Sequence, residues 1–330
     1  MSPKIVTVFG ATGYQGRSVV DSLVANKSGD LSVRAITRNP ESDKAKELSA
    51  LGAEVVKADG LDHASLVTAF QGSWAVFANT NSHDPSCSQP GGPTEVDLGK
   101  KIIDAAFEAG VQNFIYSGFE AASKITDGAV SNAAFDNKAA VTEYAKTRGF
   151  KSAVAVSPGW YLENHLSEEL APAIGGFPFV ADEEGQLTLR VPRWGGDDKI
   201  PFIGIGDDYG DIVHGVLLSP EEYNGQLVQG VSVAATAHEL TAEFEKVTGK
   251  KARWVEIPDW RDFATFDVPE LEVVKYMFGF CQHADGKYYG VANDVVTAGK
   301  LKAAAAAAKG LSGTDAELLT LEKFWRKYFA

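Results

Sequence analysis

Three regularly spaced glycines near the start of the chain have the spacing of a phosphate-binding loop. The loop reads Gly10-Ala11-Thr12-Gly13-Tyr14-Gln15-Gly16. In this pattern the first glycine permits a tight turn, the second lets the backbone approach a pyrophosphate, and the third lets a helix pack against the preceding strand. Free N–H groups at the start of that helix attract an anion. The spacing therefore predicts a dinucleotide-binding loop.

The end of the next strand pattern indicates which dinucleotide would bind. An NAD site usually carries an acid about 20 residues after the loop, where it binds the ribose 2′-hydroxyl. Here the residues Thr37, Arg38 and Asn39 include no acid. The guanidinium of Arg38 can instead pair with a 2′-phosphate through a bidentate contact. We therefore expect NADP(H) as the cofactor.

Alternating strand and helix patterns must position these residues. Short β-branched runs predict strands at residues 5–9, 32–37, 54–58, 74–79, 113–117 and 152–156. Helical periodicity lies between them, as in Val19, Val20, Leu23 and Val24. Strands and helices that alternate at this length form βαβ units with right-handed crossovers. We predict an α/β fold with a doubly wound, Rossmann-like parallel sheet that binds ligands at the carboxyl ends of its strands.

The alternation weakens after residue 157, which predicts two domains. Residues 1–157 form the expected NADP-binding domain, and residues 158–330 form a substrate-side part, of which 206–232 return to the first domain. Helices are expected at residues 160–170, at 207–218 with Asp207 or Asp208 as the cap, at 235–247, at 302–309 and at 318–329. Residues 172–205 are rich in glycine, proline and aromatic residues and predict irregular structure near the substrate.

Composition narrows the function classes. The 330 residues include 31 Lys and Arg against 44 Asp and Glu, a net charge of −13, so the chain lacks the cationic excess that direct nucleic-acid binding requires. Two cysteines, Cys87 and Cys281, suggest a reducing compartment. No signal-peptide or membrane-spanning pattern is present, so we expect a cytoplasmic protein without membrane association. The six histidines lack metal-ligand spacing, and no metal is expected.

Several further motifs resemble the NmrA-like family, atypical members of the short-chain dehydrogenase/reductase superfamily, and especially its HSCARG-type NADPH-sensor branch. They are the residues 79–81, 86–89, 116–120, 135–138 and 158–164, which read NTN, SCSQ, YSGFE, FDNK and PGWYLEN. The resemblance implies a Rossmann domain with a smaller, mainly α-helical C-terminal part. It implies cofactor binding by Gly10, Thr12, Gly13, Tyr14, Gln15, Gly16, Arg38, Asp59, Gly60, Asn79, Lys138, Tyr161 and Asn164. Asp59 and Gly60 would lie by the adenine, and Tyr161 and Asn164 by the nicotinamide.

The superfamily's usual catalytic pair is incomplete in this chain. In its Tyr-x-x-x-Lys motif, the tyrosine donates a proton and the lysine lowers the pKa of that tyrosine. Lys138 corresponds to the lysine, but Ala134 stands at the tyrosine position, and Tyr144 fits an ordinary helix residue. Ser117 lies where the superfamily often keeps a substrate-polarising serine. The catalytic candidates are Lys138, Ser117, Tyr161, Glu120, Asp84 and His165.

Three hypotheses follow, with the first favoured. The chain is an oxidoreductase of small-molecule, secondary metabolism that acts on a bulky or aromatic ketone or imine, held in an aromatic pocket of Trp160, Trp194, Phe202 and Tyr276. Alternatively, it is a non-catalytic sensor of the NADPH/NADP⁺ ratio that regulates a protein partner, with residues 82–94 as a mobile cover over the site. In the third hypothesis NADP is a structural group, and the pocket performs acid–base chemistry such as imine or iminium cyclisation.

Overall fold

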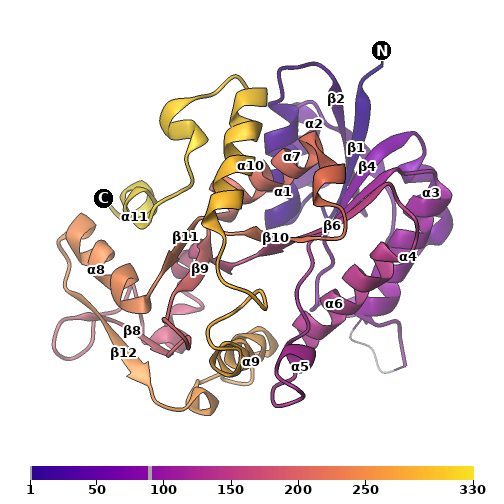
Figure 1. Ribbon diagram of the computed structural model, residues 1–330. Helices are drawn as coiled ribbons and strands as arrows, with labels where there is room; N and C mark the ends of the chain where they lie inside the picture. Colours follow the sequence, from indigo (N-terminus) through magenta and orange to yellow (C-terminus); the bar gives the residue numbers. More distant parts are fainter. Residues whose placement is uncertain (1, 88–90) are drawn as a thin grey trace.

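A large parallel sheet forms the centre of the protein (Figure 1). The structure is a computed structural model, and it describes residues 2–87 and 91–330. Its strands are β1 (Lys4–Phe9), β2 (Leu31–Thr37), β3 (Glu54–Lys57), β4 (Ser73–Ala78), β5 (Asn113–Tyr116), β6 (Ser152–Pro158) and β10 (Leu227–Gly230). They lie in the order β10-β6-β5-β4-β1-β2-β3, and every neighbouring pair is parallel. The predicted Rossmann-like sheet is confirmed.

Helices cover both faces of this sheet (Figure 1). One face carries α1 (Tyr14–Val24), α2 (Asp43–Ala50), α7 (Gly210–Leu218) and α10 (Val295–Ala308). The other face carries α3 (His63–Phe70), α4 (Glu95–Glu108) and α6 (Ala133–Lys146). Because neither face meets water, the central strands are buried along their length rather than on alternate residues, and every residue of β5 and β6 is buried.

The order of the strands creates a crevice next to β1. From β1 the chain adds β2 and β3 on one side, and it then returns to add β4, β5 and β6 on the other. The loops that leave the carboxyl ends of β1 and β4 therefore diverge. Ligands of open α/β sheets bind at such a reversal point.

Most of the chain after β6 forms a smaller part beside the sheet (Figure 1). It contains a three-stranded sheet of β7 (Trp160–Tyr161), β9 (Ile200–Ile203) and β11 (Val233–Ala235), and a parallel pair of β8 (Leu187–Pro192) and β12 (Ala252–Ile257). The helices α8 (Ala237–Thr248), α9 (Pro269–His283) and α11 (Leu321–Phe329) surround a core rich in aromatic side chains. The glycine- and proline-rich region thus forms strands that the sequence analysis did not expect.

Two segments return from the smaller part to the large sheet. The first is helix α7 with strand β10, which follow β9, and the second is helix α10, which follows α9. Helix α7 packs against α1 so closely that a Cβ atom on Gly210 would fall 2.0 Å from the carbonyl oxygen of Ser18. Strand β10 pairs with β6 in parallel register, and α10 packs on α7. The short helix α5 (Ala122–Ile125) follows β5 on the side of α6.

The helix expected over residues 160–170 is wrong. Trp160 and Tyr161 instead pair with Phe202 and Ile203 of β9, and a 3₁₀ turn follows at Leu162–Leu166. An extended backbone sends successive side chains to opposite faces. It places Trp160 in the aromatic core and leaves Tyr161 free to reach Gln15 of the glycine loop.

The expected cap of the helix over residues 207–218 is also wrong. Helix α7 begins at Gly210, after a π-helical turn at Ile205–Tyr209. The buried carboxylate of Asp208 accepts hydrogen bonds from Ser232, from Lys302 and from the backbone N–H of Leu319. Partners distant in sequence therefore satisfy this acid, which local pattern could not reveal.

In the described part of the chain, every helix is too short or too polar to cross a membrane.

Candidate functional site

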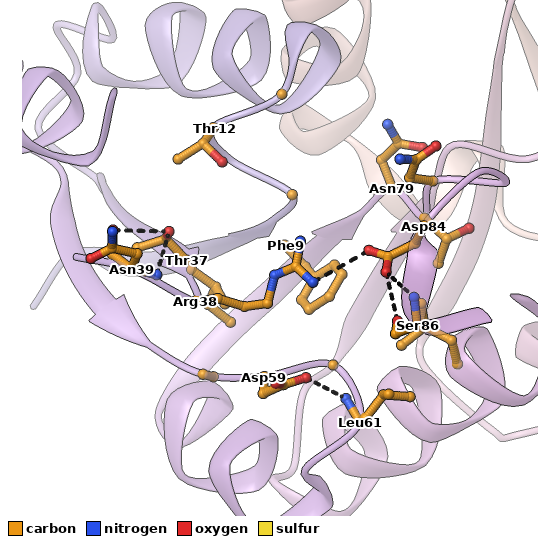
Figure 2. A pocket seen from close by; sticks show the side chains of 18 of the residues that line it. Phe9, Thr12, Thr37, Arg38, Asn39, Asp59, Leu61, Asn79, Asp84 and Ser86 are labelled. Atoms are coloured by element: carbon orange, nitrogen blue, oxygen red, sulfur yellow. Dashed lines mark hydrogen bonds and ion pairs between the residues drawn. The ribbon is translucent and has the colours of Figure 1, made fainter. Parts of the chain in front are cut away.

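The crevice beside β1 opens into a cavity of about 530 Å³ at the carboxyl ends of β1 to β4 (Figure 2). Its walls come from the glycine loop after β1, the turn after β2, the turn after β3 and the loop after β4. The lining includes Phe9, Thr12, Arg38, Asp59, Asn79 and Asp84. The cavity therefore brings together Thr12, Arg38, Asp59 and Asn79, which the sequence analysis assigned to one cofactor site, and Asp84, which it expected among the catalytic residues.

The glycine loop has the geometry of an anion site. Gly10 has φ +81°, and its carbonyl accepts the N–H of Gly13 at 3.0 Å. A Cβ atom on Gly16 would lie 2.1 Å from the Gly10 carbonyl oxygen, so only glycine lets α1 approach β1 this closely. Helix α1 begins at Tyr14 with no acid in its first turn and, among the described residues, no side-chain cap at Gly13. Its first N–H groups can therefore bind a phosphate.

The turn after β2 supplies positive charge to the cavity. Arg38 lines the wall and is 66% exposed. Ser42, on the same wall, caps α2 by accepting the N–H of Ala45 at 3.3 Å, and Lys44 in the first turn of α2 also lines the cavity. An arginine, a lysine and a helix start on one wall form a suitable site for a phosphate group.

The turn after β3 forms a tightly packed wall. A Cβ atom on Gly60 would meet the side chains of Leu98 at 2.7 Å and Phe9 at 2.9 Å. Asp59 accepts the N–H of Leu61 through Oδ1 at 2.9 Å, as Figure 2 shows. The positions expected beside an adenine thus lie in the same cavity as Arg38.

Lys138 lies in a buried polar cluster next to the cavity. Its ammonium group donates to the Thr80 carbonyl at 2.6 Å, to Thr80 Oγ1 at 3.0 Å and to Glu95 Oε1 at 2.7 Å. Thr80 Oγ1 also donates to Glu95 at 2.7 Å and lies 2.6 Å from the Tyr116 hydroxyl. Burial lowers the pKa of Lys138, while Glu95 opposes this shift. All three N–H bonds of the ammonium have acceptors, so Lys138 fixes the loop after β4.

Tyr161 joins the smaller part of the protein to the glycine loop. The Gln15 side-chain amide donates to the Tyr161 hydroxyl at 2.5 Å. Burial raises the pKa of Tyr161 to about 12, and the Gln15 hydrogen bond acts in the opposite direction. This phenol therefore stays protonated at neutral pH.

Several buried polar atoms near the ends of β1, β4, β5 and β6 have no hydrogen-bond partner among the described residues. They are Gln15 Oε1, Glu95 Oε2, Ser117 Oγ, Ser157 Oγ and Glu163 Oε2. Most buried polar groups in proteins are hydrogen-bonded, so each of these exceptions needs an explanation. A polar ligand beside the glycine loop would provide a partner for Gln15 Oε1.

The other predicted site residues lie at different distances from this cluster. Asn79 lines the cavity, with its carbonyl 3.0 Å from where a Gly10 Cβ would lie. Tyr14 is 77% exposed. Asn164 lies in the 3₁₀ turn after Tyr161. Glu120 faces the charges of Lys146, Glu143 and Lys124 rather than Lys138, and burial raises its pKa.

Asp84 and His165 lie outside the Lys138 cluster. Asp84 lies at the Arg38 end of the cavity, with its Oδ2 3.5 Å from an Arg38 nitrogen. His165 is buried among aromatic rings of the smaller part, with Nδ1 bonded to the Leu162 carbonyl at 3.1 Å, and burial lowers its pKa to about 4. The catalytic candidates are thus dispersed over several locations and do not form one cluster.

The four aromatic residues expected around a substrate do not form one open pocket. Trp160, Trp194 and Phe202 are each at most 6% exposed, and Trp160 stacks on both of the others in the core. Tyr276 is 41% exposed and packs on Trp260 instead. Of the loop at residues 82–94, positions 88–90 lie outside the described residues, including the Ser88-Gln89 part of the motif at 86–89.

Sequence reasoning missed Glu95, the ion-pair partner of Lys138. A local signal was available, because Thr94 and Asp97 form a capping box that marks the start of α4. A helix that starts directly after the loop of β4 must place its first residues at the carboxyl edge of the sheet. Glu163, by contrast, belongs to the motif at residues 158–164, and its Oε1 accepts the backbone N–H of Gly206 at 2.9 Å.

Solved structures with the same fold come from several proteins. NmrA, a negative transcriptional regulator crystallised in complex with NAD, superposes with a TM-score of 0.75 at 19% identity, over 100% of this chain and 96% of that chain. Its complex with NADP gives a TM-score of 0.74 at 20% identity, over 100% and 96%. The NADPH complex of the quinone oxidoreductase QOR2 from Escherichia coli gives 0.69 at 22% identity, over 98% and 100%.

Sequence comparison is more specific. The chain is 48% identical to the NmrA-like family domain-containing oxidoreductase FrzB of Cladobotryum sp, over 99% of this chain and 98% of the relative. It is 47% identical to the similarly named hkm9 of Aspergillus hancockii, over 99% and 97%. The profile of the NmrA-like family matches residues 2–308. From these matches and the geometry of the site we conclude that the chain belongs to the NmrA-like family.

Proposed function

We propose that this protein is an NADP(H)-dependent oxidoreductase that acts on a small, bulky or aromatic ketone- or imine-type metabolite. The observation that carries the proposal is the cavity that combines an uncapped helix start after Gly13 with Arg38 on the wall where a ribose 2′-phosphate would lie. Relatives that span the whole chain are named oxidoreductases, which supports the reaction class. The NADP and NADPH complexes of NmrA and QOR2 support the cofactor.

The residues present fit this cofactor. In our proposal the loop at residues 10–16 surrounds the pyrophosphate. Arg38 and Lys44 hold the 2′-phosphate, and Asp59 and Gly60 flank the adenine. The nicotinamide end would lie toward Asn79, Lys138, Ser117, Tyr161 and Asn164, where the unpartnered oxygens of Ser117 and Gln15 lie. Residues 1–157 with 206–232 would bind the cofactor, and the rest would bind the substrate. When bound, NADPH supplies a hydride.

The chain's own residues would then orient the substrate and its proton. Ser117 Oγ is buried and, among the described residues, unpartnered, so it can donate to a substrate carbonyl or imine. Tyr161 is a buried phenol held by Gln15, and its hydroxyl can donate a hydrogen bond to the substrate. Lys138 holds Thr80 in place through two hydrogen bonds and Glu95 through a third.

A sensor function is the second candidate, favoured by the Lys138 geometry. The ammonium has no N–H left to assist a catalytic phenol, and Ala134 occupies the position of the usual tyrosine. NmrA, which has the same fold, is a negative transcriptional regulator. In this function the bound cofactor changes a surface that a protein partner binds, with no turnover.

Calorimetric titration with NADPH and NADH tests the cofactor site. We expect NADPH to bind at micromolar affinity or better, roughly −8 kcal/mol. Arg38→Ala should cost NADPH about 2 kcal/mol, as for loss of a charge-assisted pair, and leave NADH nearly unchanged. The matched control is Arg193→Ala, because Arg193 is a 51% exposed arginine paired with Asp198 in the smaller part. Equal affinity of the wild type for both dinucleotides would refute the assignment of Arg38.

An absorbance assay with a panel of ketones, enones and imines separates the candidate functions. An oxidoreductase consumes one NADPH per product. Product formation with NADP⁺ alone and no absorbance change would instead identify acid–base chemistry on a structural cofactor. Cofactor binding without turnover, combined with a partner whose affinity depends on the cofactor, would identify a sensor.

A further inference from the structure

A carboxylate faces Arg38 across the cavity. Asp84 Oδ2 lies 3.5 Å from the Arg38 guanidinium, and Figure 2 shows the two side chains reaching toward each other from opposite walls. The Asp84 side chain is 16% exposed, whereas that of Arg38 is 66% exposed. An acid on the wall opposite the phosphate-binding arginine is unexpected, because it brings negative charge to the place where a phosphate dianion would bind.

The Asp84 carboxylate is held in this orientation by its own loop. Its Oδ1 accepts the backbone N–H of Ser86 at 2.9 Å and the Ser86 hydroxyl at 2.6 Å. The backbone is fixed as well, since the Asp84 N–H donates to the Asn81 carbonyl at 3.1 Å and the Asp84 carbonyl accepts from Cys87 at 2.9 Å. Burial acts to raise the pKa of Asp84, but the Ser86 hydrogen bonds and Arg38 outweigh it and lower the pKa. The group is therefore ionised at neutral pH.

The ion pair itself is easily displaced. At 3.5 Å between nitrogen and oxygen, with a largely exposed guanidinium, it belongs to the class of weak surface pairs. A phosphate offers Arg38 a bidentate, doubly charged acceptor, which is stronger than a single carboxylate oxygen. Arg38 can therefore exchange Asp84 for a 2′-phosphate, but the fixed carboxylate then remains close to the phosphate and repels it.

We propose that Asp84 is a specificity-determining residue of the cofactor site. Its carboxylate pairs with Arg38 when no 2′-phosphate is bound, and it weakens the binding of the phosphorylated dinucleotide. The inference rests on the proposed NADP(H) site. The proposal predicts that Asp84 lowers the ratio of NADPH affinity to NADH affinity, because NADH has no 2′-phosphate that must displace the carboxylate from Arg38. NADP(H) should therefore dissociate faster than it would from a site that has Arg38 but lacks the Asp84 charge.

Titration of the Asp84→Asn variant tests the proposal without any turnover. Asparagine keeps the shape and can still accept from Ser86, but it removes the charge. We expect NADPH and adenosine 2′,5′-bisphosphate to bind about three- to tenfold more tightly than to the wild type, as for removal of one surface charge interaction. NADH and adenosine 5′-monophosphate should change by less than about twofold.

Glu41→Gln is the matched control, because Glu41 is an 85% exposed acid near Arg38 in sequence that pairs with Lys46. Glu41→Gln should leave the affinities for NADPH and for NADH unchanged if the effect is local to Asp84. Equal tightening by both variants would show a general effect of net charge and overturn the proposal. Weaker binding of both dinucleotides to Asp84→Asn would show that Asp84 binds the ribose and also overturn it. If the wild type binds neither dinucleotide, the proposed function itself has failed, which is a distinct result.

Discussion

At the scale of single residues, the buried polar groups divide into those that the fold satisfies and those that it leaves open. Lys138 is fully engaged by Thr80 and Glu95. His165 is 1% exposed, and its Nδ1 is hydrogen-bonded to the Leu162 carbonyl. Its Nε2 lies between aromatic rings and has no hydrogen-bond partner among the described residues. An imidazole in this environment is stable only when neutral, because the surrounding rings cannot solvate a charge.

His165 should make the protein sensitive to acid. Burial lowers its pKa from 6.5 to about 4 in the folded chain. Protonation therefore favours the unfolded chain, and the stabilisation present above pH 6.5 is lost as the pH falls toward 4. We expect the free energy of unfolding of the wild type to fall by about 2–3 kcal/mol more than that of His165→Phe between pH 7 and pH 4.5.

Urea denaturation at the two pH values measures this difference. The control is His63→Phe, because His63 is a surface histidine with a 42% exposed side chain. It should change the free energy of unfolding at pH 7 by less than about 1 kcal/mol, as for a surface substitution. Identical pH dependence of the wild type and His165→Phe would contradict the buried, neutral state of His165.

At the scale of elements, the strand–loop–helix unit from β1 to α1 assigns different tasks to its glycines. Gly16 has a structural task, since its missing side chain lets α1 lie against the backbone of Gly10. Gly13 has φ −88°, and a Cβ atom there would lie 3.4 Å from the nearest atom, an ordinary contact. Its absent side chain therefore matters to a ligand more than to the fold.

Alanine at each position should separate these tasks. Gly16→Ala should lower the free energy of unfolding by about 1–3 kcal/mol, because the helix must move away from the strand. Gly13→Ala should unfold like the wild type but bind NADPH about tenfold or more weakly, because the added methyl group would lie where the pyrophosphate approaches the backbone. Denaturation and calorimetry on the same preparations measure both effects. Normal NADPH affinity in Gly13→Ala would place the pyrophosphate elsewhere.

At the scale of the whole molecule, the last helix completes the core of the smaller part. Trp325 of α11 is fully buried and packs edge-on against Phe177 and Phe244, at ring distances of 5.8 and 5.0 Å. Its indole N–H donates to the Leu240 carbonyl at 3.2 Å. The described residues that line the cavity, by contrast, all lie between Phe9 and Leu98. The cavity and α11 thus belong to different cores.

Trp325→Ala should therefore destabilise the protein without changing the cavity. We expect a loss of about 3–5 kcal/mol in the free energy of unfolding, typical of an emptied aromatic site. The affinity of the folded variant for adenosine 2′,5′-bisphosphate should stay within about twofold of the wild type. Tyr328→Ala, at a 41% exposed position on the same helix, is the control and should cost less than about 1 kcal/mol. A large loss of ligand affinity in Trp325→Ala would show that the two cores are coupled.

The sequence by itself determined the sheet and the loops after β1 and β2 that line the cavity. Strand and helix periods, the spacing of Gly10, Gly13 and Gly16, and the basic residue after β2 are local features, so each can be read from neighbouring residues. A parallel sheet then brings the carboxyl ends of its strands to one edge, whatever the details of packing.

Only the tertiary structure decided which polar groups meet. Lys138 and Glu95 are 43 positions apart, and Arg38 and Asp84 are likewise joined only by the closing of loops across the crevice. Trp160, Trp194 and Phe202 look alike in sequence whether they line a pocket or fill a core, because both environments favour large aromatic rings. Hydrophobic type is visible residue by residue, but the partner of a buried charge or ring is set by segments that fold together from distant parts of the chain.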